Sequence, residues 1–437
     1  MWPTTNIWIP QSRRTEPMDI LALAVPFFLL ALLIELAIDR VRGTGYYRIN
    51  DAVNSLSVGM FMSTSGYFTK LIPAVILAYV LQDFALIDVQ LAWFDTSPAG
   101  LGLWLLAALG FDFCYYWSHR FGHEMSILWA QHAVHHQSED YNLSTALRQT
   151  SSGFIFTWIF YVPLFLLGMP FEVFVTVNAV SLIYQFWVHT QHVQKLGWFD
   201  LVFVSPSNHR VHHAQNEIYI DKNYGGTLIL WDRLFGTFQP ELDEEPVIFG
   251  VRKPLASWNP FWANLQVYSY LWFDAVRARR WRDKLGIWFR RTGWRPEDVA
   301  AKYPKQPADL EHFHKFNPPV SASIRRYVLA QFGLAVVGIL WIGLLYATEG
   351  AQGVVVPCLL LWMTLYSLGT LSEARSYAWR VEQLRLFVVV PGGVFAMLRM
   401  SIIDAGAAEV LWIGVATYIL LSLAAIRRLS RVETVIA

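Results

Sequence analysis

Stretches of mainly apolar residues recur along the 437-residue chain, and most are close to the roughly 20 residues that a helix needs to cross a bilayer. Apolar residues make up 55% of the sequence, so lipid is the expected solvent for much of the surface. These features predict an all-α, polytopic integral membrane protein. The predicted spans cover residues 18–38, 54–83, 101–118, 154–170, 171–188, 324–346, 352–371, 386–399 and 407–426.

Three of these spans have features of their own. Residues 18–38 are too long for a signal-peptide core and precede no small-residue cleavage site, so we expect a retained anchor. The 54–83 span contains Lys70 and Pro73, which predicts either a kinked span or a span with an interfacial piece. The 386–399 span is short for a bilayer crossing.

Basic residues give the orientation of the spans. The polar region 189–323 holds 17 of the 34 Lys and Arg residues, and basic loops stay in the cytosol. Arginines near both ends of the chain indicate the same side: Arg40, Arg42, Arg48, Arg427, Arg428 and Arg431. Nine crossings then bring residues 119–150 and 189–323 together on the cytosolic face, where we expect a helical cap.

Charge and cysteine content exclude some classes of protein. The formal net charge of +1 provides no basic field to attract a nucleic acid. The two cysteines, Cys114 and Cys358, lie far apart in apolar runs, which argues against a disulfide framework and against a thiolate metal site.

Ten of the twelve histidines fall within two windows, 119–136 and 189–213. Most belong to three short motifs in which histidines recur at i, i+3 and i+4, positions that share one face of a helix. Such motifs can aim several imidazoles at one point, and neutral imidazole binds Fe, Zn, Cu and Ni well. We expect a dinuclear metal site with these ligands: His119, His123, His132, His135, His136, His189, His209, His212 and His213. The role of His192 stays open.

Three further residues are candidates for catalytic or supporting roles. Metal-bound imidazoles usually donate their second N–H to a carboxylate or a carbonyl, so polar residues near the motifs are of interest. Asp112 lies two helical turns before His119 inside an apolar span, where an ionisable group is costly. Glu124 and Asn208 are adjacent to predicted ligands.

The motifs HRFGH (119–123), HAVHH (132–136) and HRVHH (209–213) resemble the three histidine boxes of the fatty acid hydroxylase superfamily, which includes sterol desaturases. The resemblance implies two iron ions held by the box histidines and an O2-dependent attack on a lipid C–H bond. Relatives take two further histidines from the span before the last box. His189 occupies the first of these places, whereas the second place holds Val193, with His192 just before it.

Three longer segments, 111–124, 138–149 and 205–238, resemble the alkylglycerol monooxygenase family within that superfamily. This resemblance implies an ether-lipid substrate, hydroxylated next to the ether oxygen, with tetrahydrobiopterin as the electron donor. Since the sequence contains no nucleotide-binding fingerprint, the donor is expected to be external. The corresponding regions are N-terminal spans at 1–100, a histidine-box oxygenase domain at 101–320 and C-terminal spans at 321–437.

Alternatives remain open at this point. A sterol or fatty acyl hydroxylase or desaturase with a protein electron donor would carry the same boxes. A metal transporter and a purely structural zinc site are more distant alternatives, because transporters place their ligands near the bilayer midplane whereas these boxes begin where spans end. The Ala-, Trp- and Arg-rich composition favours a bacterial inner membrane, and an endoplasmic reticulum membrane is the alternative for a eukaryotic chain.

Overall fold

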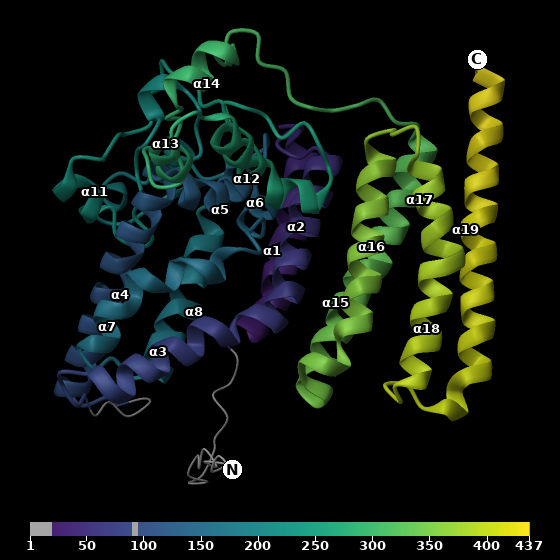
Figure 1. The fold of residues 1–437 in the computed structure, drawn as a ribbon, viewed down its shortest axis with the longest axis horizontal. Coiled ribbons are helices and arrows are strands. Elements are labelled where there is room, and N and C mark those ends of the chain that lie inside the picture. The colour runs from purple at the N-terminus through teal and green to yellow at the C-terminus, as the bar shows by residue number, and fades with distance from the viewer. Residues whose placement is uncertain (1–19, 90–94, 437) are drawn as a thin grey trace.

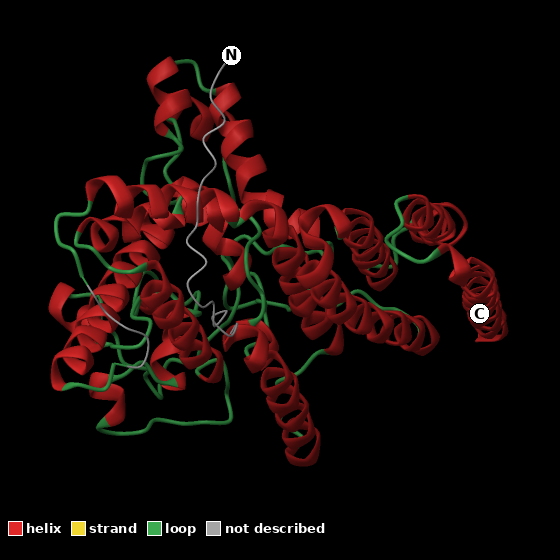
Figure 2. Ribbon diagram, turned by 90° about the horizontal axis from the view of Figure 1, so that it is seen from below, coloured by secondary structure: helices red, strands yellow, loops and turns green. Residues whose placement is uncertain are grey.

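The computed structural model describes residues 20–89 and 95–436, and within them it contains helices and loops but no strand (Figures 1 and 2). The all-α prediction is confirmed. The N-terminal half contains α1 (Ile20–Arg42), α2 (Ile49–Thr69), α3 (Leu71–Phe84), α4 (Pro98–Glu124), α5 (Ser126–His136), α6 (Leu143–Ala146), η1 (Gly153–Ile155), η2 (Thr157–Tyr161), α7 (Val162–Leu166), α8 (Phe171–Trp187), α9 (Phe199–Val202) and α10 (Pro206–His212). The rest contains η3 (Glu217–Tyr219), α11 (Leu230–Phe235), α12 (Pro260–Arg277), α13 (Trp281–Gly286), α14 (Glu297–Lys302), α15 (Ala322–Gly353), α16 (Val355–Ser372), α17 (Ala378–Leu384), η4 (Arg385–Val389), α18 (Val390–Arg399), η5 (Ala405–Ala407) and α19 (Ala408–Ile436).

Five helices of the described residues are long and apolar enough to cross a membrane, or six if the α2–α3 pair counts as one broken span. They are α4, α15, α16, the continuous helix Ala378–Arg399 and the segment Ala405–Ile426. The α2–α3 pair is bent by 50°. The break falls at Lys70, so the predicted kink in span 54–83 is confirmed.

Among the residues that the structure describes, fewer helices have the length and hydropathy of a span than the nine predicted. Residues 154–170 do not form one long helix: η2 and α7 join into the short apolar helix Thr157–Leu166, which ends before Gly168 adopts a positive φ of 86°. Helix α8 has 17 residues and falls just short of the length of a span. The predicted 386–399 span is the end of a 22-residue helix that begins at Ala378 and contains a π turn. Residues 18–19 of the first predicted span lie outside the described part of the chain.

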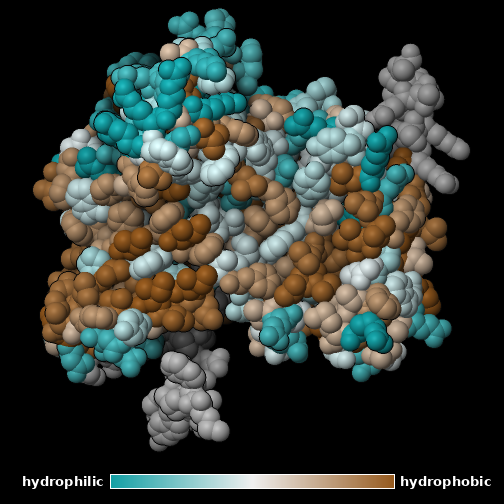
Figure 3. Space-filling model, viewed as in Figure 1, coloured by the Kyte–Doolittle hydropathy of each residue, from teal (hydrophilic) through white to brown (hydrophobic). Residues whose placement is uncertain are grey.

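The long helices and the cap occupy different levels of the molecule. In Figure 1, α5, α6 and α11–α14 gather at one end of the long helices, α15 and α16 stand beside α2, and α18 and α19 stand farther from it. Helices α15 and α16 both contact α2, and α16 also contacts α12 in the cap. Apolar side chains form a broad belt below the polar cap (Figure 3). This distribution is typical of a helical protein whose lower part lies in a bilayer.

Candidate metal centre

Helix α4 carries the first histidine box at its cap end. Its other end begins with Ser97, whose side chain accepts a hydrogen bond from the Gly100 N–H. The helix ends at Met125, whose backbone is extended, and α5 starts immediately afterwards. Backbone hydrogen bonds from Ser126 and Ile127 to the carbonyls of Arg290 and Trp288 hold this break. The first and second boxes can therefore face one another across the α4–α5 corner.

The third box lies on α10, a short helix in the cap. Ser205 caps it by accepting a hydrogen bond from the Asn208 N–H, and Pro206 occupies the first helical position. His189 follows the end of α8 and is buried. Four chain segments thus bring histidines into one region of the cap.

The structure divides the nine predicted ligands into two clusters. In each cluster, one ligand atom from every histidine lies within 4.8 Å of the others. Cluster A contains His119, His123, His132, His136 and His212, and cluster B contains His135, His189, His209 and His213. The two clusters are adjacent, because the rings of His136 and His213 stack at a centroid distance of 4.3 Å.

The second and third boxes contribute to both clusters in opposite ways. In the second box, the first and last histidines, His132 and His136, belong to cluster A and the middle one belongs to cluster B. In the third box, only the middle histidine, His212, belongs to cluster A. Residues i and i+4 are separated by about 40° around a helix, whereas i+3 points about 60° to the other side. One helix face can therefore serve two metal sites.

Backbone carbonyls fix the orientation of four imidazoles. The Nδ1–H groups of His119 and His212 donate to the carbonyls of Tyr224 and Lys222, at 2.8 and 3.0 Å. Those of His135 and His189 donate to Arg148 and Gln185, at 2.9 and 2.8 Å. Since a neutral imidazole has only one N–H, the Nε2 atom of each ring keeps its lone pair.

The Nε2 atoms point toward one another rather than toward hydrogen-bond donors. Those of His123, His212 and His213 are buried and have no hydrogen-bond partner. The Nε2 atoms of His119 and His132 are 2.9 Å apart. Two ligands on one ion are separated by about 3 Å when each metal–nitrogen bond is about 2.1 Å. The donor set and its spacing therefore fit a metal ion in each cluster.

Burial keeps these imidazoles neutral at physiological pH. It lowers the pKa of His135 to about 4. The pKa values of His136 and His213 also lie well below the usual range, mainly because the rings are desolvated and further because neighbouring histidines would repel a second charge. Neutral imidazole is the form that ligates a metal.

None of the three candidate supporting residues forms a hydrogen bond with an imidazole. Their partners are backbone groups and the side chains of Trp231 and Arg120. The Asp112 carboxylate accepts hydrogen bonds from the Thr227 and Leu228 N–H groups, at 2.8 and 3.0 Å, and from the Trp231 indole. It therefore anchors the loop that follows Tyr224.

Glu124 and Asn208 lie close to the boxes but have structural partners. Glu124 accepts a hydrogen bond from Arg120 at 3.0 Å, one turn earlier on α4. The Asn208 amide donates to the carbonyls of Asp200 and Phe203, which fastens α9 to α10. The predicted roles of Asp112, Glu124 and Asn208 in the reaction stay predictions.

His192 lies outside both clusters. Its ring is 5.0 Å from that of Tyr46, and its backbone N–H donates to the Thr190 hydroxyl. The structure thus separates it from His189, three residues earlier in the chain.

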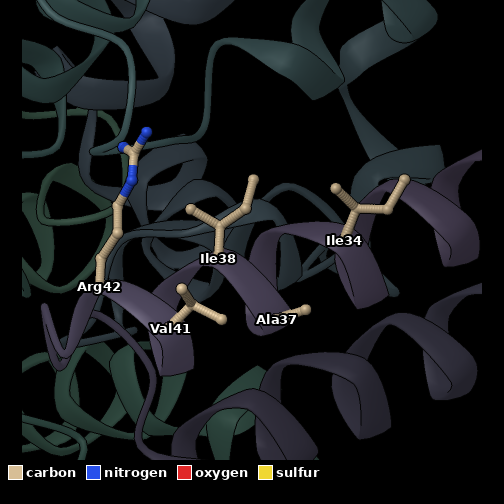
Figure 4. A pocket seen from close by; sticks show the side chains of 5 residues that line it. All are labelled: Ile34, Ala37, Ile38, Val41 and Arg42. Carbon is tan, nitrogen blue, oxygen red and sulfur yellow. The ribbon is translucent and has the colours of Figure 1, made fainter.

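A shallow groove of about 310 Å³ is also separate from the clusters, because its lining residues, Ile34, Ala37, Ile38, Val41 and Arg42, all come from α1 (Figure 4).

Sequence reasoning missed two residues that support the clusters. Arg148 provides the carbonyl for His135, and its own side chain is almost completely buried. Asp232 accepts hydrogen bonds from the Tyr224 and Gly225 N–H groups, at 2.7 and 2.8 Å, and burial raises its pKa to about 6. Both residues lie in segments that resemble the alkylglycerol monooxygenase family. Their hydrogen-bond partners, however, are backbone atoms or residues far away in the sequence, which the spacing of a motif does not reveal.

Comparison with known proteins agrees with this geometry. A family model for fatty acid hydroxylases matches residues 104–237, a region that contains both clusters. The chain is 37% identical to alkylglycerol monooxygenase of Danio rerio over 84% of its own length and 80% of the relative. It is 34% identical to alkylglycerol monooxygenase of Homo sapiens, over 85% and 81%. An ornithine lipid hydroxylase of Rhizobium tropici is 32% identical over 33% of this chain and 44% of the relative. No solved structure matches.

The fold and the histidine clusters define a membrane-bound monooxygenase of the fatty acid hydroxylase class, with a site for metal. Within this class, the length and identity of the match show that the chain belongs to the alkylglycerol monooxygenase family. The resemblance expected from the histidine boxes is confirmed.

Proposed function

We propose that this protein hydroxylates the ether-linked carbon of an alkylglycerol, using O2 and two iron ions held by clusters A and B. The resulting hemiacetal breaks down to a fatty aldehyde and glycerol. The observation that carries the proposal is the pair of buried clusters in which neutral imidazoles direct unpartnered Nε2 atoms at one another. Similarity to alkylglycerol monooxygenases over most of the chain supports the choice of substrate.

Bound iron would supply the activation of O2 for C–H cleavage, and the chain's own residues hold and shield the site. The carbonyls of Tyr224, Lys222, Arg148 and Gln185 fix the imidazole tautomers before any metal binds. Because every ligand histidine except His132 is largely buried, bulk water is excluded. The imidazoles are thus already oriented by backbone carbonyls and shielded from water, and they can bind metal without rearrangement of the protein.

The position of the site suits an amphipathic substrate. Cluster A begins where α4 leaves its apolar part, so an alkyl chain can remain among the membrane helices while the ether carbon reaches the clusters. We propose that the cap faces the cytosol, in agreement with the basic residues of 189–323, and that the membrane is a bacterial inner membrane. We also propose reduced tetrahydrobiopterin as the external electron donor.

The proposal can be tested with purified, iron-loaded protein. Aerobic incubation with an alkylglycerol and reduced tetrahydrobiopterin should yield fatty aldehyde, whereas the anaerobic reaction and the His123→Ala variant should yield none. Parallel reactions would replace the pterin by a reduced ferredoxin or cytochrome, and the alkylglycerol by a sterol or a fatty acyl lipid. Product only from a sterol or acyl lipid with a protein donor would contradict the proposal and favour the desaturase-type alternative.

A further inference from the structure

Arg148 holds an unusual position for a charged residue. Its side chain is 1% exposed, yet all its hydrogen bonds go to neutral oxygens. The Nε–H group donates to the Val134 carbonyl at 2.6 Å, and the terminal N–H groups donate to the side-chain oxygens of Gln137 and Asn54. A buried charge is costly unless it is hydrogen-bonded, so this geometry is strongly specified.

These contacts place both ends of Arg148 against the second histidine box. Its backbone carbonyl accepts the Nδ1–H of His135 at 2.9 Å, while its guanidinium binds the carbonyl of the preceding residue, Val134. The last carbonyls of a helix have no partner within the helix, and Arg148 satisfies one of them near the end of α5. One residue therefore fixes the His135 ring and the backbone that carries it.

Helix α2 holds Arg148 from the other side. The Asn54 amide accepts from the guanidinium and donates to the Trp258 carbonyl at 2.7 Å. Gly59, further along α2, allows the Leu147 carbonyl to approach so closely that a Cβ atom there would lie 2.2 Å from the oxygen. The segment that contains Arg148 is thus pressed against α2.

The C-terminal helices hold the same Trp258 loop. Glu373, at the end of α16, accepts hydrogen bonds from the Ser257 hydroxyl and the Trp258 N–H, at 2.6 and 2.5 Å. Gly369, one turn earlier, leaves room for the Trp258 carbonyl, because a Cβ atom would lie 2.6 Å from it. A continuous set of contacts therefore runs from Glu373 through Trp258 and Asn54 to Arg148.

We propose that Glu373, Trp258, Asn54 and Arg148 form a relay of positioning residues through which the C-terminal membrane helices fix His135, and hence the metal ion of cluster B. The inference rests on the proposed metal-binding function. Cluster A is oriented independently: the loop that carries the Tyr224 carbonyl is held by Asp232. Since only His135 of cluster B donates to the Arg148 carbonyl, the relay acts most directly on the ion of that cluster.

The test measures metal binding to the full-length protein without any turnover. Metal-free protein would be dialysed against Co(II), and bound cobalt would be counted and followed by its visible absorption. We expect two ions on the wild-type chain. Glu373→Ala removes the oxygen that accepts from both Ser257 and Trp258, at a position far along the chain from every ligand. It should weaken the binding of one ion by about 10- to 100-fold and change the affinity for the other by less than about twofold. Arg148→Lys should lower the affinity for the same ion.

Double variants assign the affected ion. Glu373→Ala combined with His213→Ala should still bind one cobalt, since both changes act on cluster B. Glu373→Ala combined with His123→Ala should bind none at the same concentration. Asp232→Asn is the matched control and should lower the affinity for the ion of cluster A instead. Wild-type affinity for both ions in Glu373→Ala, or equal loss of both ions, would overturn the relay. A wild-type chain that binds no cobalt would instead overturn the proposed function.

Discussion

The Nε2 atoms of His135 and His189 lie 3.1 Å apart, although both rings donate their only N–H to backbone carbonyls. Two lone pairs therefore face each other in a buried space, and neither can serve as a hydrogen-bond donor to the other. A shared cation between them removes this repulsion, and metal–nitrogen bonds of about 2.1 Å produce the observed separation. The apoprotein is thus preorganised for metal, since the carbonyls orient the rings in its absence.

Replacing His189 by alanine should halve the metal content of the protein. His189 belongs to cluster B, and loss of one of four imidazoles leaves the other ion with its full ligand set. His192→Ala is the matched control because His192 is close in sequence but lies beside Tyr46. We expect it to retain two iron ions per chain. Metal analysis after purification measures both, and a His192→Ala protein with half the iron would contradict the division into clusters.

Gly59→Ala should destabilise the protein by about 1–3 kcal/mol, the usual cost of overpacking. The new methyl group would lie 2.2 Å from the Leu147 carbonyl oxygen, so α2 or the 147–148 segment must move. Gly338→Ala, within α15, is the control, because a Cβ atom there has no neighbour within 4 Å. That change should be neutral or stabilise by up to about 1 kcal/mol, as alanine favours helix more than glycine does. Unfolding in SDS titrations compares them, and equal midpoints would refute the predicted clash.

Asp112→Asn should destabilise the protein by about 1–3 kcal/mol while both metal ions stay bound. The carboxylate accepts three N–H groups, and an amide in its place would direct its own N–H groups at some of these donors and leave them unsatisfied. Glu124→Gln is the comparison, since its partly exposed pair with Arg120 contributes less than about 1 kcal/mol. A smaller effect of Asp112→Asn than of Glu124→Gln on the SDS midpoint would show that Asp112 does not anchor the 227–231 loop.

Local patterns in the sequence predict the parts of the molecule that depend on local physics. Apolar length predicts helices such as α4 and α15, and the spacing of His132, His135 and His136 predicts a shared helix face. The assignment of the middle histidine to a different cluster depends on where the other helices lie, which spacing alone does not contain. For the same reason Arg148 went unnoticed, because its partner Asn54 is 94 residues away.

The 154–170 segment shows that apolar composition alone does not predict a membrane-spanning helix. Its composition is apolar enough for a span, so hydropathy favours one long helix, but the helix Thr157–Leu166 is short and Gly168 turns the backbone after it. Conversely, the 386–399 span extends back to Ala378 through charged residues. Glu382 and Arg385 are tolerated there because the guanidinium donates to the carboxylate and neighbouring polar side chains complete their hydrogen bonds. A hydropathy average does not register this compensation.

Breaking this Glu382–Arg385 pair should destabilise the C-terminal helices by about 3–5 kcal/mol, because the remaining charge would be buried without its partner. The side chains of Arg385 and Glu382 are 2% and 0% exposed, and the guanidinium also donates to Gln331 and Tyr418. We therefore expect Glu382→Gln to lower the SDS midpoint strongly. The double variant Glu382→Leu with Arg385→Leu should recover part of the loss, since it removes both charges at once but leaves the Tyr327 and Ser367 hydroxyls without their acceptor. Tyr418→Phe removes the hydroxyl that accepts from Arg385 and donates to Gln331, and should cost about 1–3 kcal/mol. The loss of stability in the double variant could instead equal the sum of the losses in its two single variants. The two residues would then contribute independently, and the loss would come from packing rather than from an unpaired buried charge.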